Sequence, residues 1–379
     1  MTNPRVLSRR GFSKIFAASA ACAALRPLAE LKGAGSTLLP TVISRSSATD
    51  VVRLSSNENP YGPSAAALKA MSDGFSLAWR YPDEYADILS DELAKLHNVP
   101  VNNILLGDGS GEILKLCAAA FTSRDKKLVI ANPTFEAIAR HAATASAEVV
   151  KINLTPNYHH DLAKTLAAAT GAGLVYLCNP NNPTASITPK NEIAEFLSKV
   201  PRQTIVLVDE AYHHYVESSD YESVIPLVKD NPNLIVARTF SKIYGMAGLR
   251  CGYCVTQREN IRTMGVHQIF DSVNIMALVA AVASLKDPDH VPRGRKLNSE
   301  VKKVVCGELD SLSYNYIPSH ANFMMIDLRR EVRPIIDALR NRRVEVGRIF
   351  PALPTFLRVT IGTSSQMNVF VRVFKEVMA

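Results

Sequence analysis

The residue with the clearest chemical potential is a lysine that lies between a serine and an arginine. Lys242 directly follows the apolar run 234–240, so we expect it in a turn at the end of a buried strand. Ser241 precedes it, and Arg250 follows eight residues later, just before a second apolar run. A desolvated lysine near another cation has a lowered pKa and a nucleophilic amine near neutral pH. An isolated lysine in such a turn would be an ordinary solvated residue, so other groups must support this interpretation.

Two further polar groups also follow short apolar runs. The run 174–177 leads into a loop that contains Asn182, and the run 205–208 ends at Asp209. Ligands of open α/β sheets bind beyond the carboxyl ends of the strands. Because all three groups follow apolar runs of strand length, we expect Lys242, Asn182 and Asp209 to meet at one edge of a sheet.

Together these segments resemble the cofactor-anchoring parts of fold-type I pyridoxal-phosphate (PLP) aminotransferases. The resemblance implies that Lys242 forms a Schiff base with the cofactor aldehyde. It also implies that Ser241 and Arg250 hold the cofactor phosphate, and that Asn182 contacts the pyridine 3-oxygen. Asp209 would pair with the ring nitrogen and keep it protonated, so that the ring accepts electrons when the α-proton of the substrate leaves.

Further motifs of the same family occur in the expected order. The glycine-rich turn 107–111 opens a helix whose free amides suit a phosphate, and the resemblance places Ser110 and Gly111 in contact with it. Relatives usually have Asp where Gly111 stands. Phe135 replaces a tyrosine that stacks on the ring, and Tyr212 of the Asp209 motif is a further expected cofactor contact. Ala185 replaces the usual glycine after Asn182, a change expected to shift that turn.

On the substrate side, the segments Asn57–Pro63 and Arg80–Pro82 resemble the histidinol-phosphate aminotransferase-like branch. The resemblance implies that Arg358 clamps the substrate carboxylate with a bidentate fork. It adds Arg348, Asn59 and Tyr61 as substrate-binding residues. Tyr81 is expected to reach the cofactor of a second subunit, which implies a homodimer.

The elements that must position these groups read as an α/β fold. Strands alternate with helical stretches from about residue 76 to 275, which predicts a mostly parallel, helix-covered sheet. A smaller α+β domain follows, with a helix over 293–312, a strand over 316–326, a helix over 332–341 and strands ending near 362. We predict a signal region 1–32, a linker 33–50, an N-terminal arm 51–75, a large PLP-binding domain 76–285 and a small C-terminal domain 286–379.

The N-terminal region carries most of the charge asymmetry. The 379-residue chain has a net charge of +8, and residues 1–50 hold seven Lys and Arg against two acidic residues. Arg9 and Arg10 precede the short alanine-rich apolar stretch 15–25, which resembles a twin-arginine export signal. That stretch is too short to span a membrane, which needs about 20 residues. We therefore expect a periplasmic or exported protein. A basic arm on a cytosolic enzyme is the alternative, and no basic run suggests nucleic-acid binding.

The cysteines and histidines suggest neither a disulfide framework nor a metal site. Cys251 and Cys254 lie on a predicted strand, where residues three apart face opposite sides. The histidine pairs 159–160 and 213–214 lack the spacing to a third ligand that a metal site needs.

The family resemblance spans about residues 53–362 and implies a transaminase. Its ping-pong mechanism would move an amino group from an amino acid or related amine to a 2-oxo acid through the Lys242 aldimine. Two alternatives stay open: a PLP decarboxylase resembling threonine-phosphate decarboxylase, and an exported non-catalytic binding protein. Because the intermediates of histidine synthesis are cytoplasmic, an exported enzyme is expected to use an unphosphorylated amino compound.

Overall fold

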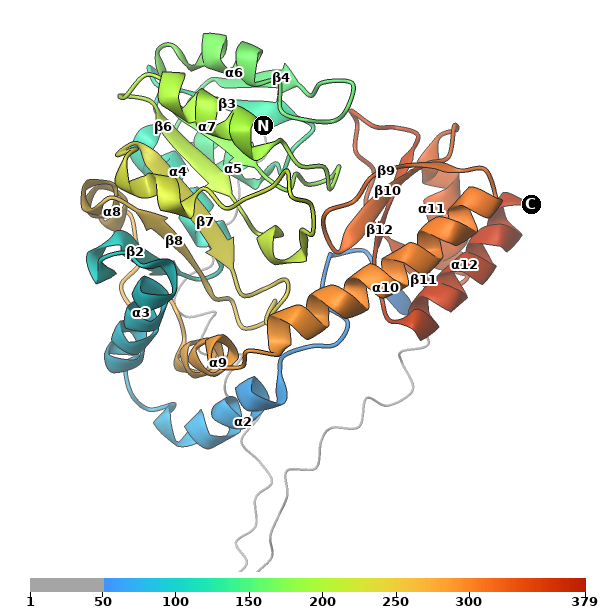
Figure 1. The fold of residues 1–379 in the computed structure, drawn as a ribbon, viewed down its shortest axis with the longest axis horizontal. Coiled ribbons are helices and arrows are strands. Elements are labelled where there is room, and N and C mark those ends of the chain that lie inside the picture. The colour runs from blue at the N-terminus through green and yellow to red at the C-terminus, as the bar shows by residue number, and fades with distance from the viewer. Residues whose placement is uncertain (1–50) are drawn as a thin grey trace, which may run out of the picture. The chain divides into compact units, whose positions relative to one another are not determined.

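The computed structural model of the protein describes residues 51–379, most of a compact unit that spans Ala48–Ala379. Its core is a seven-stranded sheet with the order β2-β8-β7-β6-β5-β3-β4 (Figure 1). All neighbouring strands run parallel except β8, which is antiparallel to both β2 and β7. The predicted mostly parallel sheet is therefore confirmed. The strands are β2 Ile104–Gly107, β3 Lys127–Asn132, β4 Val149–Asn153, β5 Ala172–Cys178, β6 Ile205–Asp209, β7 Leu234–Thr239 and β8 Gly252–Thr256.

Helices cover both faces of this sheet, which explains why its central strands are apolar throughout. One face packs against α4 (Ser110–Phe121), α5 (Ala137–Thr144) and α8 (Arg258–Gly265). The other face packs against α3, α6, α7 and α9, and α2 lies on α9. These five helices are α2 Ala65–Gly74, α3 Asp83–His97, α6 Leu162–Ala169, α7 Lys190–Lys199 and α9 Ile275–Leu285. Short 3₁₀ turns occupy Phe75–Leu77, Val101–Asn103, His213–Tyr215 and Ile225–Lys229.

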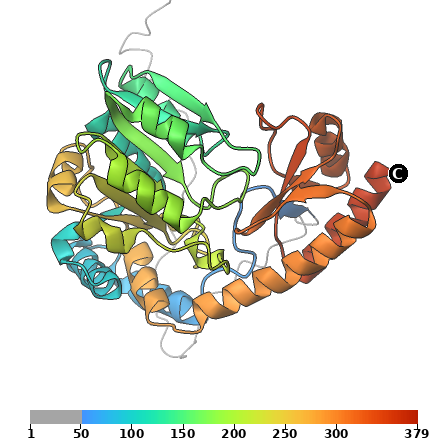
Figure 2. The same ribbon diagram turned by 45° about the horizontal axis from the view of Figure 1, so that its top comes forward.

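A second hydrophobic cluster is built from the C-terminal residues together with the start of the described chain. Strand β1 (Val52–Leu54) pairs in parallel with β11 (Val344–Val346), so residues about 290 positions apart share a ladder. The three-stranded sheet β12-β10-β9 comprises β9 Asn315–Ile317, β10 Phe323–Asp327 and β12 Phe356–Thr360. The helices here are α10 His290–Ser311, α11 Val332–Asn341 and α12 Ser364–Met378. Figure 2 shows α10 running from α9 to the three-stranded sheet, which we call the second sheet.

The prediction of one continuous strand over 316–326 was wrong. The segment forms two antiparallel strands, β9 and β10, joined by a turn. Pro318 has no amide hydrogen for a ladder, and the Ser319 hydroxyl bonds the backbone of Ala321 and Phe323 inside the turn.

The helices predicted after the glycine-rich turn, over 293–312 and over 332–341 are confirmed as α4, α10 and α11. α2 is capped by Ser64, whose side chain accepts a hydrogen bond from the Ala67 amide. The domain boundaries stay predictions, because the described residues belong to one compact unit. The predicted signal region 1–32 and linker 33–50 lie outside the described residues. Within 51–379, no helix combines the length and apolar character that crossing a bilayer requires.

Candidate active site

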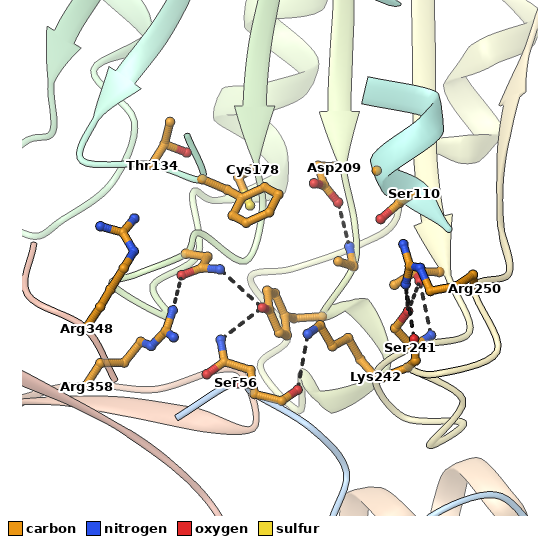
Figure 3. Close-up of a pocket in the computed structure, with 18 of the residues that line it drawn as sticks. Ser56, Ser110, Thr134, Cys178, Asp209, Ser241, Lys242, Arg250, Arg348 and Arg358 are labelled. Atoms are coloured by element: carbon orange, nitrogen blue, oxygen red, sulfur yellow. Dashed lines mark hydrogen bonds between the residues drawn. The ribbon is translucent and has the colours of Figure 1, made fainter. Parts of the chain in front are cut away.

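A cavity of about 310 Å³ opens at the carboxyl ends of β5, β6 and β7, between the large sheet and β12 (Figure 3). Most of the residues predicted from sequence line it. They are Ser110, Gly111, Phe135, Asn182, Asp209, Tyr212, Ser241, Lys242, Arg250, Arg348 and Arg358.

Asp209 lies at the floor of the cavity, at the last position of β6. Its Oδ2 accepts a 2.9 Å hydrogen bond from the Tyr176 hydroxyl, and its Oδ1 accepts one from the Ala211 amide. Burial raises the pKa of Asp209 to about 6, although both hydrogen bonds oppose that rise. The carboxylate is thus fixed in direction and poorly solvated, which suits pairing with a cationic ring nitrogen.

Lys242 enters the cavity from the turn after β7. Its Nζ lies 3.2 Å from the backbone oxygen of Asn57 and 5.5 Å from the centre of the Tyr212 ring. Burial, and then the charge of Arg358, lower the pKa of Lys242 to about 8. A substantial fraction of this amine is therefore neutral at neutral to mildly alkaline pH, as a nucleophile or proton carrier requires.

One end of the cavity is an anion site. The N-terminus of α4 presents its free amides at Ser110 and Gly111, where the helix dipole favours negative charge. Arg250 approaches the same place, with Nη1 at 3.5 Å from Ser241 Oγ and Nη2 at 3.2 Å from the backbone oxygen of Asp108. Gly109 is required here, because it has φ +72° and a Cβ would lie 2.3 Å from Arg250 Nη2.

The opposite end of the cavity carries the two other arginines (Figure 3). Arg358, in β12, is buried and donates to Asn182 Oδ1 at 2.9 Å and to the backbone oxygen of Ser55 at 2.8 Å. Its Nε is buried without a hydrogen-bond partner, and Arg358 as a whole lines the cavity. Arg348 is about half exposed and forms an ion pair with Glu136 at 2.8 Å.

Between the two ends, Asn182 and Tyr212 belong to one hydrogen-bond network. The Tyr212 hydroxyl accepts from Asn57 Nδ2 at 3.0 Å and from Asn182 Nδ2 at 3.3 Å. The substitution at Ala185 leaves Asn182 in place: Ala185 adopts φ +58°, and its amide donates to Asn181 O.

Three predicted site residues do not line the cavity of their own chain. Asn59 donates to the backbone oxygen of Ile243, and Tyr61 borders a separate groove beside α10 and α12. Tyr81 is 82% exposed. Their roles in binding stay predictions.

The structure also adds residues that sequence reasoning missed. Asn57 contacts both Lys242 and Tyr212, and Tyr176 holds Asp209. A signal existed for Tyr176: it is a polar aromatic residue in an otherwise apolar buried strand, two positions before Cys178 and on the same face of the sheet. Behind the site, Glu210 forms a buried ion pair with Arg238.

The five cysteines of the described part, Cys117, Cys178, Cys251, Cys254 and Cys306, are free thiols. No group of three or more potential metal ligands occurs within residues 51–379.

The donor set fits PLP. A phosphate matches the α4 N-terminus with Ser241 and Arg250, a ring nitrogen matches Asp209, and an aldehyde matches Lys242. Arg358 lines the other end, where a substrate anion would bind.

Comparison with known proteins agrees with this reading. Residues 49–374 match the sequence model of the family "Aminotransferase class I and II". The histidinol-phosphate aminotransferase of Moorella thermoacetica is 41% identical over 335 residues, 87% of this chain and 86% of that protein. The enzyme of the same name from Symbiobacterium thermophilum is 39% identical, over 87% of this chain and 91% of that protein.

Among solved structures, the histidinol-phosphate aminotransferase of Sinorhizobium meliloti in complex with pyridoxal-5'-phosphate superposes with a TM-score of 0.82. It is 25% identical, over 86% of this chain and 91% of that chain. These relatives are aminotransferases, so the decarboxylase alternative is not favoured.

Proposed function

Because this chain belongs to the aminotransferase class I and II family and is a PLP-dependent transaminase, we propose that its amino donor is an unphosphorylated amino acid whose carboxylate is bound by Arg358. The observation that carries this proposal is the Arg358 guanidinium. It is buried, borders the cavity beside Asn182 and retains an unpaired Nε. A buried guanidinium that lines the cavity suits an anionic group such as a carboxylate, which it binds through two parallel hydrogen bonds.

The other cavity-lining residues have separate roles in the reaction. When bound, PLP supplies the electron sink that stabilises the carbanion formed from the donor. Asp209 would orient the ring and hold its nitrogen proton, and Ser110, Ser241 and Arg250 would hold the phosphate. Lys242 would carry the α-proton, since its lowered pKa lets the amine both take up and give back a proton.

The names of the relatives identify the rival donor. They are histidinol-phosphate aminotransferases, so histidinol phosphate is the first compound to test against amino acids. The holoenzyme is mixed with a panel of amino acids and with histidinol phosphate, and both the loss of cofactor absorbance and the product are measured. We expect 2-oxo acids from amino acids. Efficient turnover of histidinol phosphate would contradict the proposed substrate, and release of CO2 would contradict transamination.

We further propose that the enzyme works as a homodimer. Large apolar side chains that would be unfavourable in water are exposed on two segments: Phe75, Trp79, Tyr81, Val266, Ile269 and Phe270. Ile269 and Phe270 border the same groove as Pro82, next to Tyr81. The molar mass from light scattering tests this, and mixing inactive Lys242→Ala and Tyr81→Ala chains tests whether Tyr81 acts across the interface. Recovered activity would support Tyr81 in trans.

Export through the twin-arginine pathway is also a proposal, supported by Arg9 and Arg10 before the apolar stretch 15–25. That pathway carries folded proteins, so PLP would be bound in the cytoplasm before transport. Cell fractionation compares wild type with Arg9→Lys/Arg10→Lys. We expect only the wild type in the periplasmic or surface fraction. If the wild type and the variant both stay in the cytoplasm, the export proposal is contradicted.

A further inference from the structure

We propose that Glu136 is a specificity-determining residue: by pairing with Arg348 at the mouth of the cavity, it disfavours donors that carry a second negative charge. This inference rests on the proposed function and names the charge class of its substrate. It assigns a role to a carboxylate that lies just outside the ring of cavity-lining residues.

Glu136 lies between β3 of the large sheet and α5, and Arg348 lies between β11 and β12, so their ion pair joins the two sides of the cavity mouth. Glu136 follows Phe135, which lines the cavity, and it is the N-cap residue of α5. Arg348 lies in the segment that joins β11 to β12. The Arg348 Nη2 to Glu136 Oε2 distance is 2.8 Å, and the side chains are 51% and 47% exposed. The pair is thus reachable by a substrate and only partly screened by water.

Phe350 links this pair to the buried arginine. The Arg348 guanidinium carbon lies 4.3 Å from the centre of the Phe350 ring, and that of Arg358 lies 5.1 Å from the same centre. Burial lowers the pKa of Arg358, and the nearby positive charge of Arg348 lowers it further. Figure 3 shows both on the side of the cavity opposite Arg250.

The charge balance at this end follows from these contacts. Arg348 and Arg358 supply two positive charges, and Glu136 offsets one of them. One net positive charge remains, which matches a single carboxylate on Arg358. A second anionic group would have to displace Glu136 from Arg348 and would then lie near an uncompensated carboxylate. At partly exposed sites such a like-charge contact lowers affinity by about tenfold.

The effect should appear in binding rather than in the chemical step, since Glu136 does not line the cavity that Lys242 and Asp209 line. Glu136 acts through Arg348 and is a positioning residue. Glu136→Gln keeps the size of the side chain and removes its charge, and Glu136→Asp keeps the charge on a shorter arm.

The test measures dissociation constants of unreactive anions on the holoenzyme, from the shift in cofactor absorbance, together with half-reactions of amino acids. Propionate carries one carboxylate and glutarate two. Alanine and glutamate are the corresponding donors, and histidinol phosphate adds a phosphate of nearly two charges at pH 7. For Glu136→Gln we expect affinity for glutarate, and the apparent affinity for glutamate, to rise about tenfold. Values for propionate and alanine should stay within about twofold.

Two variants serve as controls. Glu136→Asp should restore part of the wild-type preference. Glu308 in α10 forms a similar half-exposed ion pair with Lys375 in α12, at 2.7 Å. Glu308→Gln removes this pair and should leave every ratio of affinities unchanged.

The inference would be overturned if Glu136→Gln left the ratio of the glutarate and propionate affinities unchanged. Equal losses of affinity for both anions, or no binding of either anion, would overturn it too. Because anion binding needs no turnover, its outcome is separate from the proposed function. An enzyme that shows the binding shift but converts none of the amino acids would contradict the proposed donor and leave the role of Glu136 supported.

Discussion

The hydroxyl of Tyr176 donates a 2.9 Å hydrogen bond to Oδ2 of Asp209 at the floor of the cavity. Both residues are buried, and they extend from neighbouring strands in which Cys178 pairs with Asp209. One carboxylate oxygen is thus occupied by Tyr176 and the other by the amide of Ala211. The carboxylate cannot rotate freely, so the strand pairing itself aims Asp209 into the cavity.

Replacing Tyr176 by Phe should therefore leave Asp209 in place but reduce the fraction of its side chain that is ionised near neutral pH. The hydrogen bond lowers the pKa of Asp209, so its loss raises that pKa further and leaves less carboxylate near neutrality. We expect kcat to fall about tenfold, with the acid limb of the pH–rate profile moved to higher pH. Tyr253→Phe, which removes a buried hydroxyl bonded to His97, is the control. Equal profiles for wild type and Tyr176→Phe would rule out the role.

For Asp209→Asn we expect bound cofactor but a rate lower by roughly two orders of magnitude or more. A neutral amide cannot hold the ring nitrogen protonated, so stabilisation of the carbanion is lost. Cofactor absorbance and single-turnover rates measure the two effects separately. A variant as fast as wild type would place the electron-sink partner elsewhere.

Lys242→Ala should abolish turnover while PLP stays bound. Asp209, Ser241 and Arg250 line the cavity and would hold the ring and the phosphate independently of the lysine. Product formation and the cofactor content after gel filtration are the measurements. Activity above about a few per cent of wild type would show that another group carries the proton.

The pKa of Lys242 has its own test in the cofactor-free protein. Burial and Arg358 lower that pKa to about 8, so the reactive neutral amine appears as pH rises through 8 rather than through the ordinary lysine value. We expect acylation of Lys242, followed by mass spectrometry, to reach half its maximal rate near pH 8. Arg358→Met should move this midpoint upward, because it removes a nearby positive charge. A wild-type midpoint near 10 would refute the shift.

The same shift affects stability. The folded state holds fewer protons on Lys242 than the unfolded state between about pH 8 and the ordinary lysine value of about 10.4. The contribution of Lys242 to the stability of the cofactor-free protein therefore rises with pH across that window.

Glu210→Gln should destabilise the fold. The Glu210 Oε2 to Arg238 Nη2 distance is 2.7 Å, and both side chains are almost fully buried. Removing one partner leaves a buried charge uncompensated, so we expect the free energy of unfolding to fall by about 3 kcal/mol. Glu259→Gln, which breaks the exposed pair with Arg262, should change it by less than about 1 kcal/mol. Chemical denaturation measures both, and similar small losses would refute the importance of the buried pair.

Much of this architecture was predictable because local sequence patterns determine it. Apolar, β-branched runs that end in polar residues located β5, β6 and β7 and placed Asn182, Asp209 and Lys242 beyond them. Strands of a parallel sheet share their carboxyl edge, so their order along the chain was enough to bring these groups together. The glycine-rich turn likewise predicted the start of α4, because a helix N-terminus has a short-range signature.

The contacts that complete the site depend on the tertiary structure alone. Asn57 reaches Lys242 across 185 positions of sequence, and Arg348 reaches Glu136 across 212. No local pattern encodes such pairs, because they arise only when β1 joins β11 and the second sheet is placed against the first. The shifted pKa values of Lys242 and Asp209 have the same origin: the sequence determined which groups are present, and burial in the folded protein decided how strongly each holds its proton.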